Sequence, residues 1–259
     1  MIEIAIENET IIKNEKYQNL KGEVKILNFE NCKTRFIAPN VNIKPPKDHQ
    51  ETNTVFRLFA KTTVEVALQY KNAMILNFAS GRHPGGGYKT GAIAQEESLC
   101  RASALHNCLI TKEEEFHKPN ITSKDPAYTS AIIYSSKVPF FRDQNNQLLD
   151  EPCYYDVLSC AAINQSKKPN KDALKLMEER IERILYIAFV AKAKILILGA
   201  FGAGIFSNPP EMIADIFYRM LICKFKNVFE EVVFAILPDA KNEDKNYNAF
   251  QFQFRKLIQ

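Results

Sequence analysis

Two adjacent glutamates, Glu96 and Glu97, follow Gln95 at the start of a segment with the composition of a helix. A carboxylic acid can protonate a glycosidic leaving oxygen while an oxocarbenium-like centre develops, and a neighbouring carboxylate can bind ribose hydroxyls. A structural explanation competes with this chemistry, because acidic residues in the first turn of a helix are favoured by its dipole. On the two glutamates alone, the structural explanation is the stronger one.

Two glycine-rich loops give these glutamates a context. Residues 85–87 are three consecutive glycines ahead of the glutamates, and residues 202–204, Gly-Ala-Gly, lie within a second loop, GAFGAGIFSNPP. Glycine has no Cβ and adopts positive φ, so a sugar or phosphate can approach the backbone closely. Exposed amides near a helix N-terminus also suit anionic oxygens. Neither loop matches GxxxxGK[ST] or GxGxxG, so triphosphate and dinucleotide sites lose their main support, and a sugar or phosphate site is favoured.

Each glycine loop connects a predicted buried strand to a predicted helix. The apolar runs AMILNFA at 73–79 and KILILGA at 194–200 are typical of strands covered on both faces. The first loop leads into a predicted helix at 95–109, and the second leads into one that begins near Pro210 or Glu211. In an open α/β sheet, ligands bind outside the carboxyl ends of the strands. We therefore expect both loops at one sheet edge, where they form a single cleft.

The rest of the chain alternates predicted strands with predicted helices. Thr63 is the predicted N-cap of a helix that ends near Lys71, and the polar stretch from Asn31 to Asn53 is a predicted surface connection. The other expected elements are helices at 2–14 and about 172–192, strands at 23–29, 130–136, 153–163 and 230–237, a turn-rich piece at 140–152, and a closing helix or strand at 248–259. This alternation predicts an α/β sandwich with a mixed sheet.

Length and composition favour one globular domain. The 259 residues are 46% hydrophobic and 25% charged, with a net charge of +4, which supplies a core and allows a polyanionic ligand without requiring one. The six cysteines show no CxxC spacing, so neither a zinc site nor a disulfide framework is expected. No apolar stretch approaches the roughly 18 residues that span a bilayer, and the N-terminus lacks a signal-peptide pattern, so a cytoplasmic location is expected.

The stretch GGGYKTGAIAQEE, residues 85–97, resembles the signature of poly(ADP-ribose) glycohydrolases in both its letters and its spacing. Similarity to the bacterial-type branch of that family extends over ILNFASGRHPGGG, YSSKVPFFRD, LLDEPCYYDVLSCAAIN, LGAFGAGIFSNPP and the N-terminal IAIENETIIKN. The resemblance therefore covers most of the chain. It implies a three-layer macrodomain-like sandwich in a single domain, with an accessory N-terminal segment at about 1–60 ahead of a macrodomain core at about 61–259.

The resemblance also implies an activity, namely hydrolysis of the ribose–ribose O-glycosidic bond in ADP-ribose polymers with release of ADP-ribose. Glu97 would be the general acid that protonates the departing ribose oxygen, so it must carry a proton when substrate arrives. Glu96 would hold the hydroxyls of the distal ribose, and Gln95 would brace the first loop. Neither a cofactor nor a metal is implied, and a monomer acting on poly(ADP-ribose) or ADP-ribosylated proteins is expected.

Further site residues follow from the same resemblance. Asn77 would orient the first loop, whose glycines would wrap the distal ribose and diphosphate, while the second loop would close over the diphosphate. Ser80 stands where many macrodomains place an Asn against the distal ribose, and the chain has no Trp, so Phe206 is the candidate ring for packing against ribose or base. The expected substrate-binding residues are Asn77, Ser80, Gly85, Gly86, Gly87, Gln95, Gly202, Ala203, Gly204, Ile205 and Phe206.

Two other functions compete with this one. A macrodomain-like reader would bind ADP-ribose without cutting it, and a mono-ADP-ribosyl hydrolase would remove single ADP-ribose groups. The intact Gln-Glu-Glu triplet speaks against a reader, because simple binding has no need for an acid at that point. The sequence leaves open whether chain ends or interior bonds are cut, and which stereochemical course hydrolysis takes.

Overall fold

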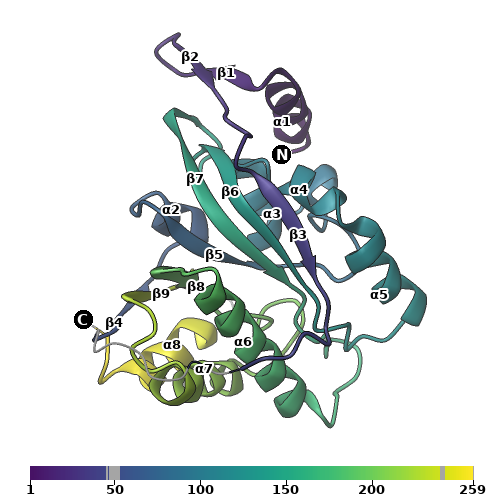
Figure 1. Cartoon of the computed structure of the whole chain (residues 1–259), viewed down its shortest axis with the longest axis vertical. Coiled ribbons are helices and arrows are strands. Elements are labelled where there is room, and N and C mark those ends of the chain that lie inside the picture. Colours follow the sequence, from purple (N-terminus) through teal and green to yellow (C-terminus); the bar gives the residue numbers. More distant parts are fainter. Residues whose placement is uncertain (45, 47–52, 240–242, 259) are drawn as a thin grey trace.

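The central feature of the computed structural model is a mixed β-sheet between two layers of helices (Figure 1). The structure describes residues 1–44, 46, 53–239 and 243–258. Within these residues, seven strands form the sheet in the order β3-β6-β7-β5-β8-β9-β4. Their bounds are β3 Lys33–Ile37, β4 Val55–Phe59, β5 Ala73–Phe78, β6 Ile132–Arg142, β7 Leu148–Cys160, β8 Ile195–Leu198 and β9 Glu231–Ala235. The predicted α/β sandwich with a mixed sheet is confirmed.

The central strands run parallel, and each buries both faces. Strand β5 pairs in parallel with β7 and β8, and β9 pairs in parallel with β8 and β4, whereas β6 is antiparallel to β7 and β3. Along β5, Met74 and Leu76 pack with the helices of one face, while Ala73 and Ile75 pack with those of the other. This alternation follows from the two-residue period of a strand. It explains why 73–79 is apolar at every position except Asn77.

The two helical layers form separate hydrophobic cores. One face carries α6 Ala173–Val190, α7 Pro210–Arg219 and α8 Lys245–Phe254. The other face carries α2 Thr63–Ala67, α3 Gln95–Ala102 and α4 Leu105–Ile110, and α5 Lys118–Ser123 follows along the chain. Short turns complete the helical elements: η1 Tyr88–Thr90, η2 Glu113–His117 and η3 Met220–Lys224. The closing segment is thus helical, and no helix among the described residues is long and apolar enough to cross a membrane.

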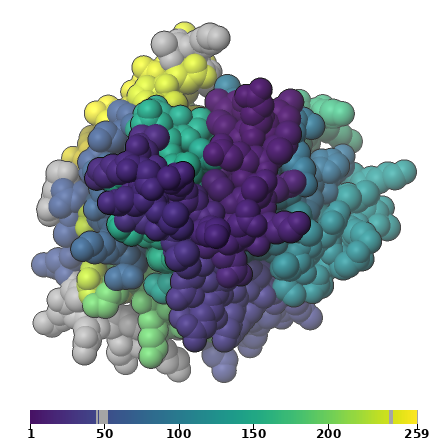
Figure 2. All heavy atoms as spheres, turned by 90° about the horizontal axis from the view of Figure 1, so that it is seen from above, coloured from purple at the N-terminus to yellow at the C-terminus, as the bar shows by residue number. Residues whose placement is uncertain are grey.

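The N-terminal segment lies on the outside of the sheet layers. Helix α1, Ile2–Asn14, ends where Glu15 takes a left-handed conformation, and a small hairpin of β1 Lys16–Gln18 and β2 Val24–Ile26 follows. The predicted helix at 2–14 is confirmed, while only the first half of the predicted strand at 23–29 pairs. Figure 2 shows this segment gathered on one face of the molecule. The division into an accessory segment and a core stays a prediction; β3 and β4, which precede residue 61, belong to the central sheet.

The stretch from Asn31 to Asn53 is not only a connection. It contains the edge strand β3, which pairs antiparallel with β6, and its residues 45 and 47–52 lie outside the described residues. Sequence reasoning missed β3 because an edge strand is half solvated: Lys33–Ile37 alternates exposed and partly buried positions and lacks an apolar run. The prediction of a surface connection was therefore wrong over the five residues Lys33–Ile37, which form a strand of the central sheet.

Helix α2 ends at Ala67, before the predicted end near Lys71, and two further helix boundaries differ from the predictions. The N-cap of α2 is Thr62, one residue before the predicted Thr63, and Thr62 forms a reciprocal capping box with Glu65. The predicted helix at 95–109 is interrupted at Ser103, whose extended backbone forms a bridge with Phe140 of β6. Because Ser103 pairs with β6, it cannot keep a helical backbone, and the segment divides into α3 and α4.

The predicted strands at 130–136 and 153–163 form one long hairpin, because β6 and β7 continue into the piece predicted as turn-rich. Only the region around Asp143 and Gln147 turns, with Asp143 Oδ1 accepting the N–H groups of Asn145 and Gln147. Register shifts between Ser135 and Val138 and between Phe140 and Arg142 bend the hairpin. Most of the piece at 140–152, which was predicted to be turn-rich, therefore belongs to the two strands of the hairpin, and only its middle forms the turn.

Candidate active site

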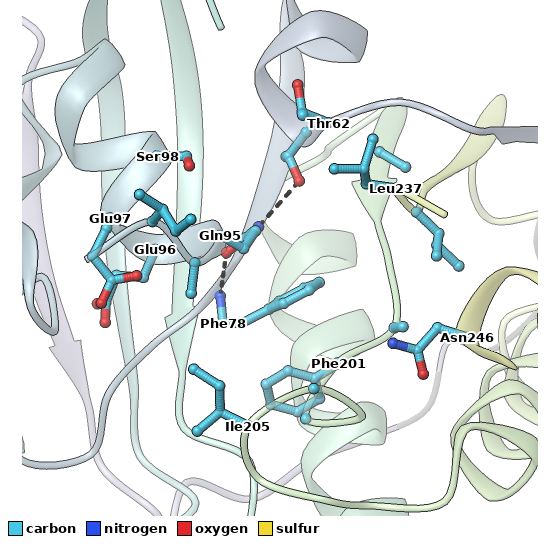
Figure 3. A pocket seen from close by; sticks show the side chains of 18 of the residues that line it. Thr62, Phe78, Gln95, Glu96, Glu97, Ser98, Phe201, Ile205, Leu237 and Asn246 are labelled. Carbon is cyan, nitrogen blue, oxygen red and sulfur yellow. Dashed lines mark hydrogen bonds between the residues drawn. The ribbon is translucent and has the colours of Figure 1, made fainter. Parts of the chain in front are cut away.

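A cavity of about 400 Å³ opens beyond the carboxyl ends of the parallel strands. Both glycine-bearing loops contribute to it, as the topology predicts. In Figure 3, Glu96 and Glu97 lie at one end of the cavity and Leu237 and Asn246 at the other. The predicted residues that line it are Ser80, Gln95, Glu96, Glu97, Gly202, Gly204, Ile205 and Phe206. The other predicted residues, Asn77, Gly85, Gly86, Gly87 and Ala203, are not among those that line it.

Glu96 is held by the end of β5 and the residues that follow it. Its side chain is buried, Oε2 accepts the N–H of Ser80 at 2.7 Å, and Oε1 accepts Nδ2 of Asn77 at 3.2 Å. Burial raises the pKa of Glu96 to about 8, these hydrogen bonds oppose the rise, and the charge of Glu97 adds to it. Asn77 therefore contacts the carboxylate of the predicted ribose-binding residue. Ser80 contacts it through the backbone, so that bond does not depend on the residue type.

Glu97 faces the glycine loop. Adjacent helix residues project about 100° apart, so the two carboxylates leave α3 in different directions. Oε1 of Glu97 accepts the N–H of Gly87 at 2.8 Å. Oε2 is buried and has no hydrogen-bond partner among the described residues. One oxygen thus anchors the side chain, and the other has no partner among the described residues.

The first loop approaches these carboxylates so closely that Gly86 has no room for a side chain. Gly85 and Gly86 have positive φ, 71° and 57°, whereas Gly87 is at −94°. A Cβ on Gly86 would lie 2.3 Å from Oε1 of Glu97 and 3.2 Å from Oε2 of Glu96. A side chain at this position would therefore strain the backbone and displace the Glu97 carboxylate or the loop.

Gln95 ties the beginning of α3 to the sheet. Its Oε1 accepts the N–H of Phe78 at 2.9 Å, and its Nε2 donates to Oγ1 of Thr63 at 3.3 Å (Figure 3). Nε2 also donates to the carbonyl of Leu76 at 2.8 Å. We predicted a brace for the first loop. The contacts run to β5 and α2, so Gln95 fixes the helix from which both glutamates project.

The second loop offers a row of backbone donors. Gly202 has a φ of 76°, and a Cβ there would lie 2.4 Å from that of Ala162, so the loop packs tightly at this point. Throughout the described parts of the chain, no carbonyl accepts the N–H groups of Gly204, Ile205 and Phe206. Three such amides in succession form a surface suited to anionic oxygens.

Phe206 of the second loop contacts the first loop indirectly, through the ring of Tyr128. Its ring centroid lies 5.9 Å from that of Tyr128, and the Tyr128 ring covers Gly81, where a Cβ would be only 2.7 Å away. Phe206 is also one of the residues that line the cavity. Its ring therefore has a packing partner in Tyr128 and also lines the cavity, and its packing against ribose or base stays a prediction.

Several lining residues were not predicted. Phe78 and Phe201 form a ring pair with centroids 5.8 Å apart, and Leu237 and Asn246 close the far end. Phe78 could have been found, because it directly follows Asn77 at a predicted strand end. Leu237 follows β9 and Asn246 lies in α8, so both depend on tertiary contacts that leave no pattern in the sequence.

The cysteines and acidic residues supply no metal centre in the described ranges, which contain no group of three or more His, Cys, Asp or Glu side chains placed to hold an ion. The six cysteines are free thiols. Sγ of Cys32 and Sγ of Cys108 lie 3.6 Å apart, outside the cavity.

The raised pKa of Glu96 predicts a pH-dependent stability. Because folding raises this pKa from 4.5 to about 8, the folded protein holds the proton more tightly than the unfolded chain. That stabilisation is fully present below about pH 4.5 and is lost as the pH rises to about 8. In urea denaturation, the free energy of unfolding should therefore fall more for wild type than for Glu96→Gln between about pH 5 and pH 8.5. Parallel curves would contradict this, and Glu3→Gln, at an exposed position on α1, is the control.

Together the mixed sheet, its helical layers and the two loops above one cavity define a macrodomain-like α/β protein. The family model for the microbial-type PARG catalytic domain, where PARG is poly(ADP-ribose) glycohydrolase, matches residues 5–143. The chain belongs to the microbial-type PARG family. No curated protein sequence matches it.

Solved structures of bacterial PARGs resemble 87–98% of this chain. PARG from Thermomonospora curvata is 29% identical, with 98% of both chains covered and a TM-score of 0.89. The same enzyme bound to the inhibitor ADP-HPD gives 28% identity, 98% coverage of both chains and a TM-score of 0.88. PARG from Deinococcus radiodurans in complex with ADP-ribose is 30% identical over 87% of this chain and 95% of that chain, with a TM-score of 0.78.

Proposed function

We propose that this protein hydrolyses the ribose–ribose O-glycosidic bond of ADP-ribose polymers and releases ADP-ribose, with Glu97 as the general acid. The observation that carries the proposal is the arrangement at Glu97, where one carboxylate oxygen is fixed by Gly87 and the other is buried without a partner among the described residues, beside the cavity. Similarity to bacterial PARGs solved with ADP-ribose and with ADP-HPD supports the substrate class.

The terminal ADP-ribose unit occupies the cavity in this proposal. Its diphosphate accepts hydrogen bonds from the amides of residues 204–206, and its distal ribose lies against the first loop and Glu96. The adenosine end extends toward Phe78 and Phe201, whose rings provide an apolar surface. The anomeric carbon of the distal ribose is then within reach of Glu97.

In each catalytic cycle Glu97 donates one proton and later accepts one. The carboxyl group of Glu97 donates its proton to the leaving ribose oxygen while the bond from that oxygen to the anomeric carbon breaks. Water adds to the anomeric carbon, and its proton passes to the Glu97 carboxylate, which restores the acid. The products are free ADP-ribose and a polymer one unit shorter. Since the two glutamates are sequence neighbours, they are not the opposed carboxylate pair of ordinary glycosidases.

Two substrates distinguish this proposal from its alternatives. Wild-type protein is incubated with polymer-modified protein and, separately, with singly ADP-ribosylated protein, and free ADP-ribose is measured by chromatography. We expect release from the polymer only. Release from the singly modified protein would favour a mono-ADP-ribosyl hydrolase, and ADP-ribose binding without release from either substrate would favour a reader.

A further inference from the structure

A buried asparagine of the N-terminal helix connects that helix to the active-site loop. Asn8 of α1 has no exposed surface. Its Nδ2 donates to the carbonyl of Arg101 at 2.8 Å and to Oη of Tyr88 at 3.3 Å, and its Oδ1 accepts Nε of Arg142 at 2.8 Å. Burying an amide is costly unless its groups find partners, and here both ends of the amide are satisfied.

Two partners of Asn8, Tyr88 and Arg101, lie on either side of the segment that connects the glycine loop to the first turns of α3, the helix that carries Glu97. Tyr88 directly follows Gly87, whose N–H anchors Oε1 of Glu97. Arg101 lies on α3, the helix that carries Glu97, and its guanidinium donates to the carbonyl of Ala92 at 2.6 Å. A single side chain therefore holds both the residue beside the anchor and the helix that bears the acid.

The rest of α1 covers the same segment. The helix packs against η1 and α3. Glu9 forms an exposed ion pair with Lys89 at 2.7 Å, and a Cβ on Gly91 would face Ile2 at 3.5 Å. In Figure 1, α1 lies beside the end of the sheet layer that carries α3 and α4. Asn8 is the residue of α1 whose side chain forms hydrogen bonds with buried groups of this segment, namely the Tyr88 hydroxyl and the Arg101 carbonyl.

We propose that Asn8 is a positioning residue of the active site, setting the distance between the Gly87 N–H and the Glu97 carboxylate by fixing Tyr88 and Arg101. The inference rests on the proposed function, because it concerns the placement of the proposed acid. A misplacement of about 1 Å in a reacting group can cost about 10²-fold in rate. Asn8 acts only through its neighbours and touches no substrate.

Kinetics of Asn8→Ala in the full chain tests the positioning role. We expect kcat on poly(ADP-ribose) to fall about tenfold or more, with KM changed less than about threefold, because acid placement suffers more than substrate binding. Asn19→Ala is the matched control: Asn19 is buried in the same N-terminal segment, but its side chain bonds within the β1–β2 hairpin and to Asp150. Glu9→Gln, which breaks only the exposed ion pair, should keep the wild-type kcat.

Hydrogen exchange gives a readout that does not depend on activity. The Gly87 amide proton should exchange faster in Asn8→Ala than in wild type or Asn19→Ala, because its bond to Glu97 is loosened. If wild type releases no ADP-ribose, the proposed function fails while this exchange measurement still decides the positioning role. Unchanged Gly87 exchange in folded Asn8→Ala, or equal losses of kcat in Asn8→Ala and Asn19→Ala, would overturn the inference.

Tyr88→Phe covers the case in which Asn8→Ala does not fold. This substitution removes only the hydroxyl that Asn8 contacts and retains the buried ring. It should accelerate Gly87 exchange and lower kcat by a smaller factor, about two- to fivefold, since one hydrogen bond is lost. Wild-type values for both quantities would show that the contact between Asn8 and Tyr88 positions nothing.

Discussion

Glu97→Gln should reduce ADP-ribose release from the polymer by at least about 10²-fold while ADP-ribose binding stays within about threefold of wild type. An amide has the same shape as the carboxyl group but cannot supply an acidic proton to the leaving oxygen. Its Oε1 can still accept the N–H of Gly87, so the loop keeps its anchor. Initial rates on the polymer and calorimetric titration with ADP-ribose give the two numbers.

The decisive comparison is between turnover and binding in the same preparation. Equal losses of both would mean that the substituted amide distorts the loop, and the experiment would then report on structure. Turnover close to wild type with intact binding would remove Glu97 from the role of acid and leave Glu96, whose pKa is raised by burial, as the remaining candidate. Unchanged thermal unfolding of the variant serves as the control for folding.

The sequence predicts those parts of the fold whose patterns are local. The apolar run of β5 and the period of α6 place both elements within a residue or two, because burial on both faces of a strand and on one face of a helix leaves a clear periodicity. Strand β3 and the break at Ser103 could not be predicted, because both depend on pairing with β6, which lies far away in the chain. Edge strands and helix breaks of this kind are determined by tertiary contacts and leave no local pattern in the sequence.

The candidate site likewise contains residues that local sequence patterns predict and residues that only tertiary contacts bring in. Glycine loops, strand ends and the Gln-Glu-Glu triplet predict one cleft, and eight of the predicted residues line it. The proposed separation of roles between Glu96 and Glu97 came from resemblance, and the structure adds that the two side chains have different partners: Glu96 bonds to Asn77 and Ser80, and Glu97 bonds to Gly87. Asn8 and Asn246 could not be found in advance, because each reaches the site region from an element remote in sequence.

Gly86→Ala should lower kcat/KM on the polymer by about 10²-fold or more and weaken ADP-ribose binding as well. A left-handed backbone costs an alanine roughly 1–2 kcal/mol, and the new Cβ would lie 2.3 Å from Oε1 of Glu97, so either the loop or the carboxylate must move. Backbone strain alone can be separated from this clash with Gly22→Ala, whose φ is also positive, at 82°, and whose Cβ would approach only Gln18, at 3.6 Å. Both variants should lose stability in thermal unfolding, whereas only Gly86→Ala should lose activity. Equal activities would mean that the close approach of the loop to Glu97 does not govern the placement of the acid.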